Sequence, residues 1–200
     1  MNVNLEILTW TEILTDLKAL ALKILQDKKH IDVIVSIGRG GNCPSRILSD
    51  FLNVQNLYNI NVRYYRDIEK KTESPLITQP LIIKLTDKNI LLCDDVSDSG
   101  NSLEVVKDYI QDMGCASLTT ATLYIKPWTK SIPDFYIKQT KAWIVFPWEY
   151  IETLEKLTRS YRDKGFSSDA IKDALISTGF DPDSIDFYLN LQIYFKNQEE

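Results

Sequence analysis

The most informative segment of the sequence is Ile90-Leu91-Leu92-Cys93-Asp94-Asp95-Val96-Ser97-Asp98-Ser99-Gly100-Asn101-Ser102. Its first four residues are apolar, as is typical of a buried parallel strand. Two carboxylates follow at the expected end of that strand, and a turn of small polar residues leads into a helix over 103–113. This order places backbone N–H groups and hydroxyls at a helix N-terminus, where a phosphate is favoured. Carboxylates suit ribose hydroxyls or a divalent cation, so the segment predicts a site for a phosphorylated sugar.

Around this segment, helical and strand patterns alternate along the chain. Apolar residues recur with a helical period over 11–26, and short apolar or alternating runs indicate strands. We expect helices at 11–26, 44–52 and 103–113, and strands at 32–37, 57–65, 90–93, 117–125 and 134–137. This alternation predicts an α/β fold with a doubly wound, mainly parallel five-stranded sheet. Ligands of such sheets bind at the carboxyl ends of the strands.

Two stretches depart from this alternation. The polar run over 66–79 is either a solvated loop or a mobile cover of the site. The tail reads as three helices, over 150–164, 167–178 and 182–194, with Ser or Asp caps and Gly stops. It carries no catalytic constellation, so we expect it to pack onto the core or to mediate self-association. A separate partner-binding module is the less favoured alternative. The expected domains are residues 1–149 and a helical C-terminal extension over 150–200.

The amino-acid composition limits the classes of function that we expect for this protein. Hydrophobic residues make up 44% and charged residues 26% of the chain, which is ordinary for a globular protein. No run approaches the roughly 18 apolar residues of a membrane span, and the N-terminus lacks a secretory pattern, so a cytoplasmic location without membrane contact is expected. The net charge of −5 argues against a nucleic-acid partner. Three cysteines without Cys-x-x-Cys spacing predict neither a disulfide nor a zinc site.

The segment over 90–102 resembles the phosphoribosyl-pyrophosphate (PRPP) motif of type I phosphoribosyltransferases. That motif is two or three aliphatics, Asp-Asp, an aliphatic, any residue, Asp-Thr/Ser-Gly, any residue and Ser/Thr, and every position is filled here. The resemblance runs from about Leu8 to Glu149 and is closest to the xanthine-guanine and hypoxanthine-guanine enzymes. These enzymes move ribose 5-phosphate from PRPP to a ring nitrogen of a base and release pyrophosphate.

The resemblance implies the type I fold with a small hood, and a purine-salvage activity that depends on Mg²⁺. The implied ligands are PRPP, a 6-oxopurine base (guanine, hypoxanthine or xanthine), the nucleoside monophosphate and pyrophosphate, and a homo-oligomer is expected. The 5-phosphate would lie in the loop formed by Asp98, Ser99, Gly100, Asn101 and Ser102. An ordinary strand-to-helix turn with Ser and Asp caps is the alternative for that loop.

The same resemblance assigns the sugar, metal and pyrophosphate contacts. Asp94 and Asp95 would meet the ribose hydroxyls and Mg²⁺, because two adjacent buried carboxylates repel without such a ligand. Pyrophosphate would bind the loop of Gly38, Arg39, Gly40 and Gly41, in which Arg39 supplies a cationic fork. In the family this loop often contains a non-proline cis peptide, which we expect at Gly38–Arg39. A simple glycine turn after a strand is the alternative.

The base contacts follow from the chemistry of a 6-oxopurine. Lys126 donates hydrogen bonds and accepts none, so it favours a ring oxygen over the amino group of adenine. By resemblance, Trp143 stacks on the base and the Ile144 carbonyl accepts from a 2-amino group, although these residues also suit an ordinary core. Asp98 would take the N7 proton, and Val96 would pack beneath the ring. The expected catalytic residues are Asp98, Lys126 and Arg39.

Two alternatives stay open at the level of sequence. One is a PRPP- or nucleotide-sensing regulator that keeps the fold and binds without turnover. The other is a phosphoribosyltransferase for a different base, namely adenine, orotate or uracil. The acidic net charge and the presence of all three site segments count against the regulator.

Overall fold

The computed structural model describes residues 4–66 and 73–196, which form two compact units. One unit comprises Thr11–Lys141, and the other combines the residues up to Trp10 with those from Ala142 onward. Among the described residues, no helix has the length and apolar character needed to cross a membrane. The domain boundary expected at 149/150 stays a prediction.

The larger unit is built on a six-stranded sheet with the order β4-β3-β2-β5-β6-β7. Its strands are β2 (Val33–Ile37), β3 (Leu57–Arg66), β4 (Glu73–Gln79), β5 (Asn89–Ser97), β6 (Ser117–Ile125) and β7 (Lys138–Gln139). All neighbours pair in parallel except β3 and β4, which are antiparallel. Four of the five strands expected from the sequence are therefore present, as β2, β3, β5 and β6, and β4 adds an antiparallel edge.

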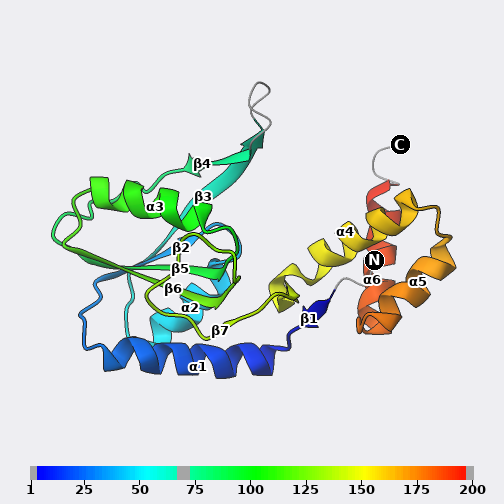
Figure 1. Cartoon of the computed structure of the whole chain (residues 1–200), viewed down its shortest axis with the longest axis horizontal. Helices are drawn as coiled ribbons and strands as arrows, with labels where there is room; N and C mark the ends of the chain where they lie inside the picture. The colour runs from blue at the N-terminus through cyan, green and yellow to red at the C-terminus, as the bar shows by residue number, and fades with distance from the viewer. Residues whose placement is uncertain (1–3, 67–72, 197–200) are drawn as a thin grey trace. The chain divides into compact units, whose positions relative to one another are not determined.

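Helices cover both faces of this sheet. The helix α3 (Asn101–Asp112) lies on one face, and α1 (Trp10–Gln26) and α2 (Asn42–Phe51) lie on the other (Figure 1). Side chains of a strand alternate between the two faces. On the α3 side, the core contains a set of buried aliphatic residues from β2, β3, β5 and α3, among them Val35, Ile60, Ile90, Leu92 and Val106.

Two expected elements differ from the structure. The strand expected at 134–137 is wrong, because Asp134 accepts hydrogen bonds from the backbone N–H and hydroxyl of Thr120 (2.7 and 2.8 Å). This side chain takes the place of a strand carbonyl, so Phe135 makes only an isolated bridge and β7 starts at Lys138. The loop expected over 66–79 is wrong for the described residues of that run, because Arg66 ends β3 and Glu73–Gln79 forms β4. Residues 67–72 lie outside the described residues.

The smaller unit contains a two-stranded parallel sheet and the helical tail. Its elements are β1 (Leu5–Ile7), β8 (Trp143–Val145), the short 3₁₀ helix η1 (Pro147–Glu149), α4 (Tyr150–Asp163), α5 (Ser168–Ser177) and α6 (Pro182–Lys196). The three helices follow the expected pattern, and Ser167 caps α5 by accepting from the Ala170 N–H. They share a buried core with the sheet, formed by Val145, Leu154, Ile171, Leu175, Phe180, Ile185 and Tyr188.

Candidate phosphosugar site

The strand β5 continues through the acidic pair to Ser97, three residues beyond the point where the pair begins. Because adjacent strand residues face opposite sides of a sheet, the two carboxylates diverge. Asp94 follows Ile90 and Leu92 on the α3 side and is half-buried, whereas Asp95 faces the α2 side and is 5% exposed. The expectation of two buried carboxylates side by side is therefore wrong.

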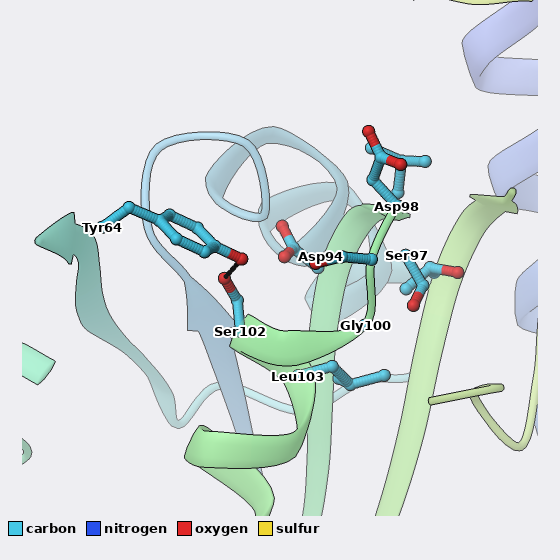
Figure 2. Close-up of a pocket in the computed structure, with 10 residues that line it drawn as sticks. Tyr64, Asp94, Ser97, Asp98, Gly100, Ser102 and Leu103 are labelled. Carbon is cyan, nitrogen blue, oxygen red and sulfur yellow. Dashed lines mark hydrogen bonds between the residues drawn. The ribbon is translucent and has the colours of Figure 1, made fainter. Parts of the chain in front are cut away.

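A cavity of about 190 Å³ opens on the α3 side, at the carboxyl end of β5. Figure 2 shows the Asp94 carboxylate turned toward the side chains of Tyr64 and Ser102. Six of the predicted site residues line this cavity: Asp94, Val96, Asp98, Ser99, Gly100 and Ser102. The other lining residues are Tyr64, Ser97, Leu103 and Thr122, which sequence reasoning missed.

The loop before α3 has the geometry of an anion cradle. Gly100 is the N-cap of α3 and has a φ of 82°, which glycine adopts without strain. A Cβ at this position would come within 2.5 Å of the Ser131 nitrogen, so no larger residue fits. The Ser99 carbonyl accepts from the Lys130 N–H (3.0 Å), and the Ser97 hydroxyl donates to the Ser131 carbonyl (2.8 Å). The loop is thus held against the segment that follows β6.

Tyr64 approaches this loop from β3. Its hydroxyl is hydrogen-bonded to the Ser102 hydroxyl at 3.1 Å (Figure 2). The contact joins residues 38 positions apart, and no local pattern in the sequence predicts it. It places a third hydroxyl beside the predicted phosphate loop.

The glycine-arginine loop lies at the carboxyl end of β2, next to β5. A Cβ on Gly40 would come within 2.3 Å of Asp95 Oδ2, and one on Gly41 within 2.7 Å of the Cys93 carbonyl oxygen. Both glycines are therefore required by close approach to β5. The glycine-arginine loop and the acidic segment converge, as expected from neighbouring parallel strands.

All peptide bonds in the described residues are trans, so the cis peptide expected at Gly38–Arg39 is wrong. The loop turns instead through Gly38, whose φ of 54° lies in the left-handed region. The Gly41 N–H then donates to the Ile37 carbonyl at 3.0 Å, which closes the turn. Arg39 at its tip is exposed.

Lys126 directly follows β6 and is buried, with 6% of its surface exposed. Its backbone N–H donates to the Ser97 carbonyl, and its Nζ lies 6.0 Å from the centroid of the Trp128 ring. The Trp128 indole N–H donates to Asp98 Oδ1 at 2.7 Å. Trp128, another residue that sequence reasoning missed, therefore lies against both predicted catalytic side chains of this region.

The predicted purine-covering residues lie in the smaller unit. Trp143 is 49% exposed, and Lys156 Nζ lies 5.8 Å from its ring centroid. The Trp143 N–H donates to Asn4, and the Val145 carbonyl accepts from Leu8. Since alternate residues of a parallel strand bond to the same neighbour, the intervening Ile144 carbonyl is directed away from β1. Its direction is compatible with the predicted role as a hydrogen-bond acceptor.

Metal-binding chemistry at this site is limited to hard oxygen donors. In the part of the chain that the structure describes, no three His, Cys, Asp or Glu side chains are placed to share a metal ion. Mg²⁺ commonly uses one or two carboxylates plus substrate phosphates, so a single carboxylate, that of Asp94 or that of Asp95, would suffice to hold such an ion. Cys93 does not compete, because burial raises the pKa of its thiol to about 12 and keeps it protonated.

The connections of the sheet define the class of protein. From β2 the chain passes through α2 to β3 on one side, and from β5 through α3 to β6 on the other. The two loops therefore flank the switch point between β2 and β5, where open α/β sheets bind their ligands. The fold is that of an open α/β protein with its candidate ligand site at this edge of the sheet.

The family model of the phosphoribosyl transferase domain matches residues 4–152. The chain belongs to this family, as the motif over 90–102 predicted. A xanthine-guanine phosphoribosyltransferase of Desulfotalea psychrophila is 33% identical over 147 residues, covering 71% of this chain and 84% of the relative.

Two solved structures extend the comparison. A purine phosphoribosyltransferase from Pyrococcus horikoshii is 40% identical with a TM-score of 0.67, covering 72% of this chain and 94% of its own. A Neisseria gonorrhoeae protein with bound ppGpp is 28% identical with a TM-score of 0.70, covering 78% and 94% of the respective chains. These similarities confirm the α/β phosphoribosyltransferase fold.

Proposed function

We propose that the protein transfers ribose 5-phosphate from PRPP to N9 of a 6-oxopurine in purine salvage, giving GMP, IMP or XMP and pyrophosphate. The proposal rests on the convergence of the glycine-arginine loop and the acidic segment. Gly40 packs against Asp95, next to the loop that leads into α3. The names of the bacterial and archaeal relatives support a purine as the acceptor.

Each part of PRPP has a matching set of groups. The 5-phosphate binds the loop of Asp98 to Ser102, where the helix N-terminus and hydroxyls favour an anion. Asp94 accepts from a ribose hydroxyl. The N–H groups of Gly38 to Gly41 and the Arg39 guanidinium bind pyrophosphate.

The transfer exchanges one bond to the anomeric carbon for another. The bond between C1 and the pyrophosphate oxygen breaks, and the bond between C1 and N9 forms through an oxocarbenium-like state. The N7 proton passes to Asp98 as N9 attacks. Mg²⁺, which Asp94 or Asp95 would hold, would supply charge neutralisation for pyrophosphate. Lys126 donates to the 6-oxo group, Trp143 stacks on the ring, Val96 packs beneath it and Ile144 accepts from a 2-amino group.

The direct test is a transfer assay with radiolabelled guanine, hypoxanthine, xanthine and adenine, each with PRPP and Mg²⁺. We expect nucleotide from the 6-oxopurines and much less from adenine. Adenine as the best substrate contradicts the assigned base pocket, and binding of PRPP without nucleotide from any base contradicts an enzyme. Chelation of Mg²⁺ is expected to stop the reaction.

A nucleotide-sensing regulator is the second candidate. The specific observation in its favour is the ppGpp bound to the Neisseria gonorrhoeae protein. This ligand combines a guanine, a ribose and two diphosphates, the same chemical groups as the proposed substrates and products. The transfer assay separates the two candidates, because a regulator binds such ligands without turnover. The cytoplasmic location and the homo-oligomer stay predictions.

Replacing Lys126 with alanine is expected to lower kcat/KM for 6-oxopurines, because a charged hydrogen bond is lost. The expected loss of transition-state stabilisation is about 1–3 kcal/mol. The measurement compares guanine and hypoxanthine with adenine under identical PRPP concentrations. Lys130→Ala is the matched control, since Lys130 is an exposed cation in the same segment. Equal losses for all bases would contradict a role in recognising the 6-oxo group.

Replacing Tyr64 with phenylalanine is expected to raise the KM for PRPP about three- to tenfold, since one neutral hydrogen bond beside the phosphate loop is lost. The KM for the base should stay unchanged in steady-state kinetics. Tyr58→Phe is the control, because Tyr58 lies on the same strand but does not line the cavity. An unchanged KM for PRPP would mean that Tyr64 only packs against Ser102.

A further inference from the structure

Three polar side chains join β2, β3 and α2 beneath the glycine-arginine loop. Asn59 Nδ2 donates to the Gly38 carbonyl (2.7 Å) and to Asn42 Oδ1 (2.8 Å). The Ser36 hydroxyl also donates to Asn42 Oδ1 (2.8 Å) and is 1% exposed. Asn59 and Ser36 are on the α2 side of the sheet, the side that Asp95 faces. Asn42 is the first residue of α2.

The donors and acceptors in this set fix each other's orientation. The Gly38 carbonyl only accepts, so Asn59 must turn its NH₂ group toward it. The second N–H of that group lies within hydrogen-bond distance of both Asn42 Oδ1 (2.8 Å) and the Ser36 hydroxyl oxygen (2.9 Å). Because the Ser36 hydroxyl donates its own proton to Asn42 Oδ1, Asn42 presents its oxygen to this set with either acceptor. With two donors on Oδ1, the NH₂ group of Asn42 is left on the opposite side of its planar amide.

The hydrogen bond to Gly38 also orients a peptide group. A trans peptide directs its C=O and the following N–H to opposite sides. Holding the Gly38 oxygen toward Asn59 therefore directs the Arg39 N–H away from β3. A flip of this peptide would instead turn a carbonyl oxygen toward any anion bound in the loop.

We propose that Asn59 is a positioning residue for the leaving group: it fixes the Gly38 carbonyl and the Asn42 amide so that the Arg39 N–H and the Asn42 NH₂ group face pyrophosphate. This inference rests on the proposed function, since it assumes that the glycine-arginine loop binds pyrophosphate. Asn59 itself acts through Gly38 and Asn42 and does not contact the substrate.

The test uses Asn59→Ala, Asn59→Asp and, as the matched control on the same strand, Asn61→Ala. Aspartate keeps the shape of asparagine but sets a carboxylate against the Gly38 carbonyl. Asn61 donates to Gln79 at the edge of the sheet instead. Steady-state kinetics gives the KM for PRPP and for the base, and calorimetry gives the Kd of magnesium pyrophosphate and of GMP.

We expect both Asn59 variants to raise the KM for PRPP and the Kd for pyrophosphate about tenfold, from the loss of two hydrogen bonds. GMP, which lacks pyrophosphate, should bind as in the wild type, and Asn61→Ala should change nothing. If Asn59 only stabilised the fold, its variants would weaken the binding of magnesium pyrophosphate and of GMP equally, or would weaken neither. Either result overturns the proposal.

A second variant keeps the proposal testable if Asn59→Ala fails to fold. Asn42 is exposed, so Asn42→Ala should fold normally and still weaken pyrophosphate about threefold or more. Unchanged pyrophosphate binding in Asn42→Ala and Asn59→Asp overturns the inference. Absence of transfer activity in the wild type would instead overturn the proposed function, so the two failures are distinguishable.

Discussion

Replacing Gly40 with alanine is expected to reduce phosphoribosyl transfer about 10²-fold or more, because small displacements of groups around a reacting centre have effects of this size. The added methyl group would come within 2.3 Å of Asp95 Oδ2. The carboxylate cannot move aside easily, since it is 5% exposed and its Oδ1 accepts from the Val96 N–H at 2.7 Å. Either the glycine-arginine loop or Asp95 must shift, and both belong to the proposed PRPP site.

The measurement is kcat/KM for PRPP together with the thermal unfolding midpoint. The φ of Gly40 lies outside the left-handed region, so alanine is compatible with its backbone and restricts the unfolded chain. The matched control is Gly114→Ala, where φ is 78° and no atom lies within 4 Å of the added Cβ. We expect Gly114→Ala to lower the thermal unfolding midpoint but not kcat/KM. For Gly40→Ala, we expect the fall in kcat/KM to be the larger effect. Full activity of Gly40→Ala would contradict the convergence of the two loops at the PRPP site.

Much of the fold was predictable because its signals are local. The apolar run before Asp94 and the small-residue turn before α3 act within about a dozen neighbouring residues, and the parallel sheet follows from their repetition. The antiparallel strand β4 was missed because it contains Pro75 and polar residues, and edge strands tolerate both. Its pairing with β3 depends on tertiary contact rather than on a hydrophobic pattern.

The candidate site was predicted where the residues carry a motif or a family resemblance. The motif identified six residues that line the cavity, but it did not show that β5 continues past Asp94 and separates the two carboxylates. Tyr64 and Asn59 come from β3, and they reach the site only because β3 lies beside β2 in the sheet. Strand order is a property of the assembled sheet, so the sequence pattern within β3 does not predict the roles of Tyr64 and Asn59.

Replacing Asp98 with asparagine is expected to lower kcat about 10²–10⁴-fold, the usual contribution of a positioned proton acceptor. Asparagine has nearly the same shape as aspartate and still offers an oxygen to the Trp128 indole N–H, which donates to Asp98 at 2.7 Å. The phosphate loop should therefore keep its geometry. The side chain loses only its ability to take the N7 proton.

The KM for PRPP and the Kd of the nucleoside monophosphate decide whether the loss is chemical. Both should stay within about threefold of wild type if Asp98 acts in the transition state, because an interaction made only there lowers kcat without weakening ground-state binding. Trp128→Phe is the control: it keeps the carboxylate and removes only its indole partner, so its kcat should fall far less. If both variants lost the same activity, the orientation of Asp98 rather than proton transfer would account for the effect. If Asp98→Asn weakened nucleotide binding in proportion to kcat, the Asp98 carboxylate would act in ground-state binding of the nucleotide rather than in proton transfer, and the proton would have to leave by another route.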